Sequence, residues 1–163
     1  MARQQNEQNK QAAAKREQLS TGSVMPEIEL PNPEGDIIKL SSLRGKVVLV
    51  DFWAKWCRPC RAENPNLVRI YNQYKDQGFT VYSISLDGLP QQPTPKEDWT
   101  SAIQQDGLSW DNHVSDLQGW NSPVAQNFGI TSIPFTILID RDGTIIDTDL
   151  RGPELEAKLV EVL

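Results

Sequence analysis

Two cysteines, Cys57 and Cys60, are the residues of this sequence whose type and spacing most directly indicate chemistry. They are the only cysteines in the chain, and they follow an apolar run that ends at Trp53. This order predicts a buried strand that passes into a helix, so both thiols lie at a helix N-terminus, where free N–H groups and the helix dipole stabilise a thiolate. Residues three apart on a helix are also within disulfide distance. The spacing therefore predicts a reversible dithiol switch.

Paired cysteines have two other common uses. A zinc site needs four ligands, but the chain has no second cysteine pair and a single histidine, His113. A purely structural disulfide at this spacing closes a loop too small to constrain the unfolded chain much, and a domain of this length does not need one. Redox chemistry is the favoured interpretation, and no metal or other cofactor is expected.

The composition is that of a globular protein. The 163 residues suffice for one domain and a tail. A net charge of −6, without a basic patch that contains aromatic residues, argues against a nucleic-acid partner. No apolar stretch is long enough to insert into a membrane, and no secretory signal is visible, since the longest apolar run near the N-terminus is the three alanines 12–14. A cytoplasmic protein and an excised piece of an exported one both fit these features.

Sequence patterns along the chain predict alternating strands and helices. Residues 1–21 are polar without an apolar face, which predicts a solvated linker or frayed helix outside a domain of residues 22–163. Strands are predicted at residues 28–30, 37–40, 47–53, 79–86, 112–114, 135–140 and 144–148. Helices are predicted at 58–75, 96–105 and 124–128, with a last one opening at 152–153. A strand–helix–strand unit followed by a hairpin and a helix predicts an α/β fold, a three-layer sandwich with a mixed sheet.

With these residues and motifs, the chain resembles the thioredoxin superfamily and, within it, the TlpA/ResA-type thiol–disulfide oxidoreductases, including the TlpA-like domains of Bacteroidetes. The resemblance covers about residues 22–163. It is carried by residues 50–60, with two tryptophans, an acid and Cys-x-Pro-Cys, and further by Ile133-Pro134, Pro65 and the segments 114–121 and 150–152. It implies a thioredoxin-like three-layer α/β/α sandwich with a central helical insert, and an interdomain linker over residues 1–21.

Each cysteine has an expected role. Cys57 is the expected nucleophile, because it lies nearest the helix start. There the helix stabilises a thiolate most strongly and solvent access is greatest. Arg58 adds a positive charge expected to lower the pKa of this thiol, unless it only faces solvent. Cys60, one turn deeper, is expected to resolve the mixed disulfide that Cys57 forms with a substrate. Pro59 fits the first helical turn, where its missing donor costs little.

Deprotonation of a shielded Cys60 requires a base, and two acids are candidates. Asp51 interrupts the apolar run of a buried strand, where burial raises the pKa of a carboxyl group, so it can take a proton from Cys60 directly or through water. By resemblance it occupies the buried acid position of thioredoxin. Glu63 follows Cys60 by three residues and matches the active-site glutamate of ResA-like proteins; an exposed helix charge is its alternative.

The substrate-binding residues are expected around the cysteines. The resemblance implies a cis bond between Ile133 and Pro134, with Pro134 facing the cysteines. The backbone of Ile133 then pairs with an extended substrate segment as an added strand does. Trp56, Arg58 and Pro59 are the other expected contacts.

The favoured function is a thiol–disulfide oxidoreductase that reduces disulfides of exported proteins. By resemblance it acts in the periplasm, takes electrons from another dithiol protein such as a membrane reductase, and can serve cytochrome c maturation. A thiol peroxidase of the peroxiredoxin-related group is the alternative, but Ala54 stands where such sites usually have threonine. A redox-inert binding module is a third possibility, which the intact cysteine pair disfavours.

Overall fold

Two continuous apolar strands form the centre of the fold. The computed structural model describes residues 2–163, with side chains from residue 6 onward. Strands β3 (Val47–Trp53) and β4 (Phe79–Ser85) are buried along their whole length. They run parallel, in a register that pairs Val47 with Phe79 and Trp53 with Ser85. Strands covered on both faces are rich in apolar side chains, which explains the apolar runs in the sequence; the exceptions are Asp51 in β3 and Thr80, Ser83 and Ser85 in β4.

The remaining strands complete a mixed sheet in the order β5-β4-β3-β6-β7. Strand β5 (His113–Val114) is parallel to β4, whereas β6 (Phe135–Ile139) and β7 (Ile145–Thr148) are antiparallel to their neighbours. A separate antiparallel pair consists of β1 (Glu29–Pro31) and β2 (Ile37–Lys39). The predicted mixed sheet is confirmed.

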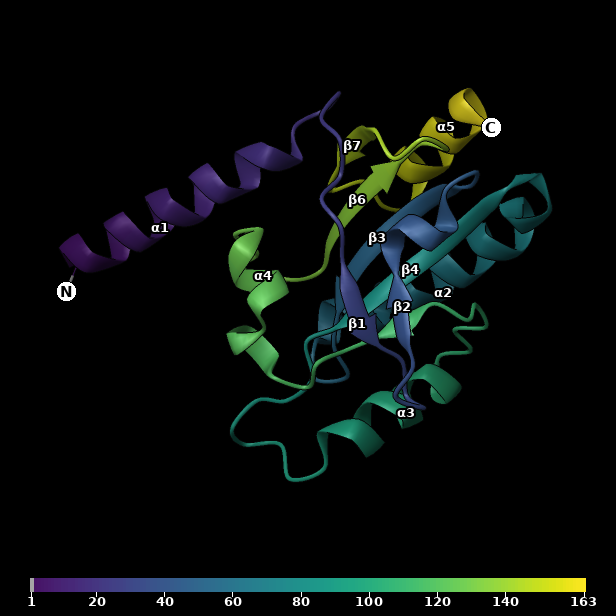
Figure 1. Ribbon diagram of the computed structural model, residues 1–163. Coiled ribbons are helices and arrows are strands. Elements are labelled where there is room, and N and C mark those ends of the chain that lie inside the picture. The colour runs from purple at the N-terminus through teal and green to yellow at the C-terminus, as the bar shows by residue number, and fades with distance from the viewer. Residues whose placement is uncertain (1) are drawn as a thin grey trace.

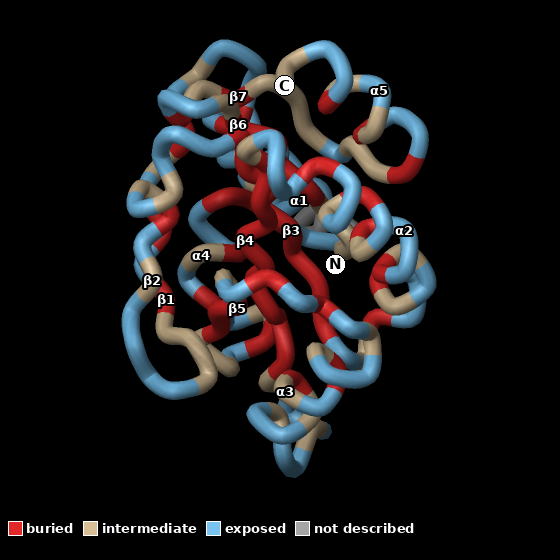
Figure 2. The backbone as a smooth tube through the Cα atoms, turned by 90° about the vertical axis from the view of Figure 1, so that its right-hand side faces the viewer, coloured by how far each residue is buried: buried red, intermediate tan, exposed pale blue. Residues whose placement is uncertain are grey.

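Helices cover both faces of the sheet. In Figures 1 and 2, α2 (Arg58–Tyr74) and α5 (Pro153–Val162) lie on one face, and α4 (Pro123–Asn127) lies on the other with β1 and β2. The insert between β4 and β5 contains α3 (Pro95–Gln105). Short 3₁₀ helices lie at Glu17–Leu19, Leu40–Leu43, Lys75–Gln77 and Gly119–Asn121. This arrangement confirms the predicted three-layer α/β/α sandwich.

The N-terminal helix α1 (Ala2–Arg16) extends away from the sheet in Figure 1. Its last residue contacts the domain, because the Arg16 side chain donates a hydrogen bond to the carbonyl oxygen of Gly129 at 2.6 Å. Leu19, just after α1, is buried in the core. Packing against the domain therefore begins before residue 22, where the domain boundary was predicted, and that boundary stays a prediction.

Neither a membrane span nor a metal centre is found in the described part of the chain. Among residues 2–163, none of the helices combines the length and apolar character needed to cross a bilayer. Within the same residues, no three His, Cys, Asp or Glu side chains come together as metal ligands. The lone His113 is buried and stacks on Trp110, with ring centroids 5.5 Å apart.

Candidate active site

The two cysteines meet where β3 ends and α2 begins. Cys57 is the N-cap residue of α2, and it forms a disulfide with Cys60, whose Cα atom lies 5.3 Å away. The backbone N–H of Cys60 donates to the Cys57 sulfur at 3.2 Å. This donor and the positive end of the helix dipole favour a negative charge on Cys57 when the bond is open.

Both cysteines are shielded from solvent. The exposed fraction is 4% for Cys57 and 2% for Cys60. The Cys57 sulfur lies 3.7 Å from the carbonyl oxygen of Ile133, and the bond between Ile133 and Pro134 is cis, as the resemblance implied. Cys57 is thus the more exposed cysteine, but it is much less open than predicted, because the loop ahead of β6 packs against its sulfur.

The expected substrate contacts border the disulfide. Two of them are exposed, Arg58 and Pro59, and three are half-buried, Trp56, Ile133 and Pro134. The indole N–H of Trp56 donates to the carbonyl oxygen of Leu86 at 3.2 Å, which fixes the ring beside the end of β4. Its centroid lies 5.9 Å from that of Trp120. The role of these residues in binding stays a prediction.

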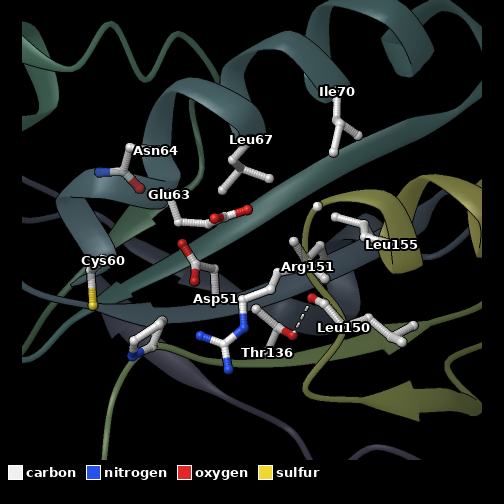
Figure 3. Close-up of a pocket in the computed structure, with 13 residues that line it drawn as sticks. Asp51, Cys60, Glu63, Asn64, Leu67, Ile70, Thr136, Leu150, Arg151 and Leu155 are labelled. Carbon is white, nitrogen blue, oxygen red and sulfur yellow. Dashed lines mark hydrogen bonds between the residues drawn. The ribbon is translucent and has the colours of Figure 1, made fainter.

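A small cavity lies beside Cys60, between α2, β3 and the segment that precedes α5 (Figure 3). Its volume of about 20 Å³ leaves room for one water molecule. The polar or ionisable side chains that line it are those of Asp51, Cys60, Glu63, Asn64, Thr136 and Arg151. Such a chamber can pass a proton between Cys60 and a carboxyl group.

Asp51 brings a carboxyl group into this cavity from the middle of β3. It is 6% exposed, and burial raises its pKa to about 7. The positive charge of Arg151 acts against this rise, whereas the negative charge of Glu63 adds to it. A carboxyl group with a pKa near neutrality can both accept and release a proton at physiological pH.

Glu63 lines the same cavity from α2, one turn after Cys60. It is half-buried, and in Figure 3 its carboxyl group lies beside that of Asp51. The fold therefore brings both candidate acids next to Cys60, while Arg58 stays outside on the exposed surface. Which acid acts as the base stays a prediction.

Sequence reasoning missed Arg151 as a member of this site. The residue belongs to a segment that contributes to the family resemblance, but a lone arginine between a strand and a helix gives no sign of what it faces. Its place in the cavity depends on the tertiary fold, which brings the start of α5 next to β3.

Asp87 is a second residue that sequence reasoning missed. It is fully buried after β4, and both carboxyl oxygens lie 3.1 Å from the backbone nitrogen of Lys55, which donates to them. The Ser85 hydroxyl and the Gln92 side-chain amide donate to it at 2.6 and 2.9 Å. Asp87 thus ties β4 to the loop that leads to Cys57. An acid directly after an apolar strand was the available signal.

Replacement of Asp87 is expected to destabilise the fold. Asp87→Ala leaves donors on Lys55, Ser85 and Gln92 without an acceptor, so the free energy of unfolding should fall by about 2–4 kcal/mol. Urea denaturation followed by tryptophan fluorescence measures this change. Asp87→Asn retains one carbonyl acceptor and should lose less. Equal stability of the Asp87→Ala variant and the wild type would contradict the assigned anchoring role.

Similar proteins are thiol–disulfide oxidoreductases. Residues 21–148 match the profile of the AhpC/TSA family. The thiol-disulfide oxidoreductase ResA of Bacillus cereus is 25% identical over 150 residues, which cover 92% of this chain and 80% of that protein. The crystal structure of the thioredoxin domain of a thiol-disulfide oxidoreductase from Bacteroides vulgatus is 37% identical, with a TM-score of 0.76 over 88% of this chain and 99% of that one. A thiol-disulfide oxidoreductase from Bacteroides fragilis is 35% identical, with a TM-score of 0.77 over 86% and 100% of the two chains.

Proposed function

Since the chain belongs to the AhpC/TSA family and is a thiol–disulfide oxidoreductase, we propose that it reduces disulfides of other proteins with the dithiol of Cys57 and Cys60. The observation that carries this proposal is the hydrogen bond from the Cys60 N–H to the Cys57 sulfur at the start of α2. It gives Cys57 the environment of an attacking thiolate and leaves Cys60 one turn deeper, beside the cavity.

The first step joins the protein to its substrate. The Cys57 thiolate attacks one sulfur of the substrate disulfide, a new S–S bond forms, and the second substrate sulfur leaves as a thiolate that takes up a proton. An extended substrate segment pairs with the backbone of Ile133, whose carbonyl oxygen already lies beside Cys57. Backbone hydrogen bonds depend little on the side chains of the substrate, so substrates of different sequence can bind in this way. Trp56, Arg58 and Pro59 supply the surrounding contacts, and Pro134 lies next to the reacting sulfurs.

The second step releases the substrate. The Asp51 carboxylate takes the Cys60 proton, directly or through a water molecule in the cavity, and the Cys60 thiolate then attacks the Cys57 sulfur. The mixed disulfide breaks, the bond between Cys57 and Cys60 forms, and the bound substrate sulfur leaves as a thiolate that is protonated. Two electrons have passed to the substrate. Glu63 acts on this step through its charge beside Asp51.

We further propose that the substrates are exported proteins and that the protein works in the periplasm. The support is the resemblance to TlpA- and ResA-type proteins, and the similarity to a relative named thiol-disulfide oxidoreductase ResA. A second dithiol protein is the proposed electron donor, because each turnover leaves the disulfide form, which must be reduced again. Cytochrome c maturation is one task that fits this direction of electron flow.

A paired assay tests the reductase function against the peroxidase alternative. The reduced protein is mixed either with insulin, whose chains separate and precipitate once its disulfides are reduced, or with hydrogen peroxide in a stopped-flow instrument. We expect catalytic insulin reduction with a dithiol donor, and slow oxidation by peroxide. Rapid oxidation by peroxide without insulin reduction would replace the proposed function by a peroxidase activity.

A further inference from the structure

The segment of residues 149–152 holds one arginine against the cavity. Thr136 of strand β6 holds this segment through two hydrogen bonds. The backbone N–H of Asp149 donates to the carbonyl oxygen of Thr136 at 2.7 Å. The Thr136 hydroxyl donates to the carbonyl oxygen of Leu150, also at 2.7 Å. Asp149 has a φ of 59°, a left-handed conformation that costs energy for a residue other than glycine. Its carboxylate accepts a hydrogen bond from the Arg151 guanidinium at 2.9 Å. The position of Arg151 is therefore built by several specific contacts.

Arg151 is the one cation among the residues that line this cavity. The titratable or charged groups there are Asp51 from β3, Cys60 and Glu63 from α2, and Arg151 itself, while β6 contributes only the uncharged Thr136. The Arg151 side chain is 41% exposed, and its guanidinium, paired with Asp149, lies on the side of the Asp51 carboxyl group opposite Glu63 (Figure 3). One positive charge, which also pairs with Asp149, thus lies beside Asp51 at a cavity that holds two acids and the buried Cys60.

We propose that Arg151 is a positioning residue for the second step of the reaction: its charge keeps Asp51 available as the carboxylate that takes the proton from Cys60. The proposal rests on the proposed function. Burial and the Glu63 charge both favour the protonated form of Asp51, and a protonated carboxyl group cannot accept the Cys60 proton. The Arg151 charge opposes both effects, and it thereby sets the lowest pH at which the substrate is released.

A two-phase assay tests this inference on the whole protein. The reduced protein is mixed with an aromatic disulfide reagent that releases a coloured thiol: the first phase reports attack by Cys57, and the second reports release by Cys60. Arg151→Met should leave the rate of the first phase unchanged. The pH below which the rate of the second phase falls should rise by about one pH unit, because Asp51 is then protonated at higher pH. If the rate of the second phase falls with a midpoint near pH 7 in the wild type, that shift makes this phase about fivefold slower at pH 7.

Four further variants give the test its controls. Arg151→Lys, which keeps the charge, should restore the wild-type profile, and Glu63→Gln should lower the pH below which the second phase slows. Arg69→Met is the matched control, because Arg69 bonds Glu156 between α2 and α5 outside the cavity, and it should change nothing. Arg151→Met added to Asp51→Asn should cause no further shift, since the group that Arg151 acts upon is gone.

The outcomes distinguish a failure of the role inferred for Arg151 from a failure of the proposed function. If the Arg151→Met profile coincides with the wild type while Asp51→Asn slows the second phase, Arg151 has no such role and the reaction scheme stands. If Arg151→Lys is as slow as Arg151→Met, the side chain acts through its shape and the electrostatic inference is wrong. If Asp51→Asn leaves the wild-type profile unchanged, the base assignment of the proposed function fails as well.

Discussion

Cys57→Ser is expected to abolish disulfide reduction, and Cys60→Ser is expected to stop the reaction at a covalent complex with the substrate. Without the Cys57 sulfur no mixed disulfide forms, so insulin reduction should fall to the uncatalysed rate, a loss of about a thousandfold or more. Without Cys60 the first attack still occurs, but no internal thiol releases the substrate. Electrophoresis without reductant, followed by mass spectrometry of the retained species, measures the complex.

The two single variants control each other. The complex formed by Cys60→Ser should disappear when a small thiol is added, and the variant that lacks both cysteines should form none. Expressed in the native host, Cys60→Ser should also retain the physiological substrates, which identifies them and their compartment together. Retention of substrates by Cys57→Ser but not by Cys60→Ser would reverse the assigned order of attack.

Asp51→Asn is expected to slow release of the mixed disulfide about a hundredfold above pH 7, at the lower end of the range for general base catalysis. The amide occupies nearly the same volume but cannot accept the Cys60 proton. The attack by Cys57 should keep its rate, because Asp51 lines the cavity on the Cys60 side. The two-phase assay with the aromatic disulfide reagent separates these steps. Equal slowing of both phases would show that Asp51 acts on the site as a whole.

The same variant is expected to be more stable than the wild type at neutral and higher pH. The pKa of Asp51 rises from 3.8 to about 7 on folding, so between these values the folded protein holds a proton that the unfolded chain has released. Stability therefore falls as the pH rises through this window and stays low above it. A shift of about three pKa units corresponds to about 4 kcal/mol, which Asp51→Asn should recover.

Urea denaturation of the disulfide form at pH 5 and pH 8 measures this effect. The wild type should lose stability between the two pH values relative to Asp51→Asn, whose side chain does not titrate. Parallel pH dependences of the two proteins would mean that Asp51 carries no raised pKa in the fold.

The strands and the long helix of the active site were predictable from local patterns. The apolar run interrupted by Asp51 predicted β3 with its observed bounds, and the predicted helix from residue 58 differs from α2 by one residue at its end. Burial on both faces leaves a simple signal, because most positions of such a strand are apolar and an acid among them stands out. The raised pKa of Asp51 followed from the same pattern, since an acid within such a strand loses its hydration.

Contacts between distant segments were not predictable in this way. The carbonyl group of Ile133 covers Cys57, and Ile133 lies 76 residues away in sequence. The residues around the cysteines therefore could not indicate how little of Cys57 is exposed to solvent. Asp87 left a local signal, an acid directly after an apolar strand, but its contact with the backbone of Lys55 depends on the tertiary fold. Arg151 left no local signal of the cavity that it lines. The resemblance supplied the pairing of Ile133 and Pro134 with the cysteines, which local patterns alone did not contain.

The account depends most on Cys57 being the thiolate that reacts first, and alkylation of the reduced protein tests this directly. The protein is treated with limiting iodoacetamide over a range of pH, and the modified cysteine is identified by mass spectrometry. The account predicts that Cys57 is labelled before Cys60, and at a pH well below that needed to label a free cysteine. Labelling of Cys60 first, or a Cys57 that reacts with the pH dependence of free cysteine, would contradict it.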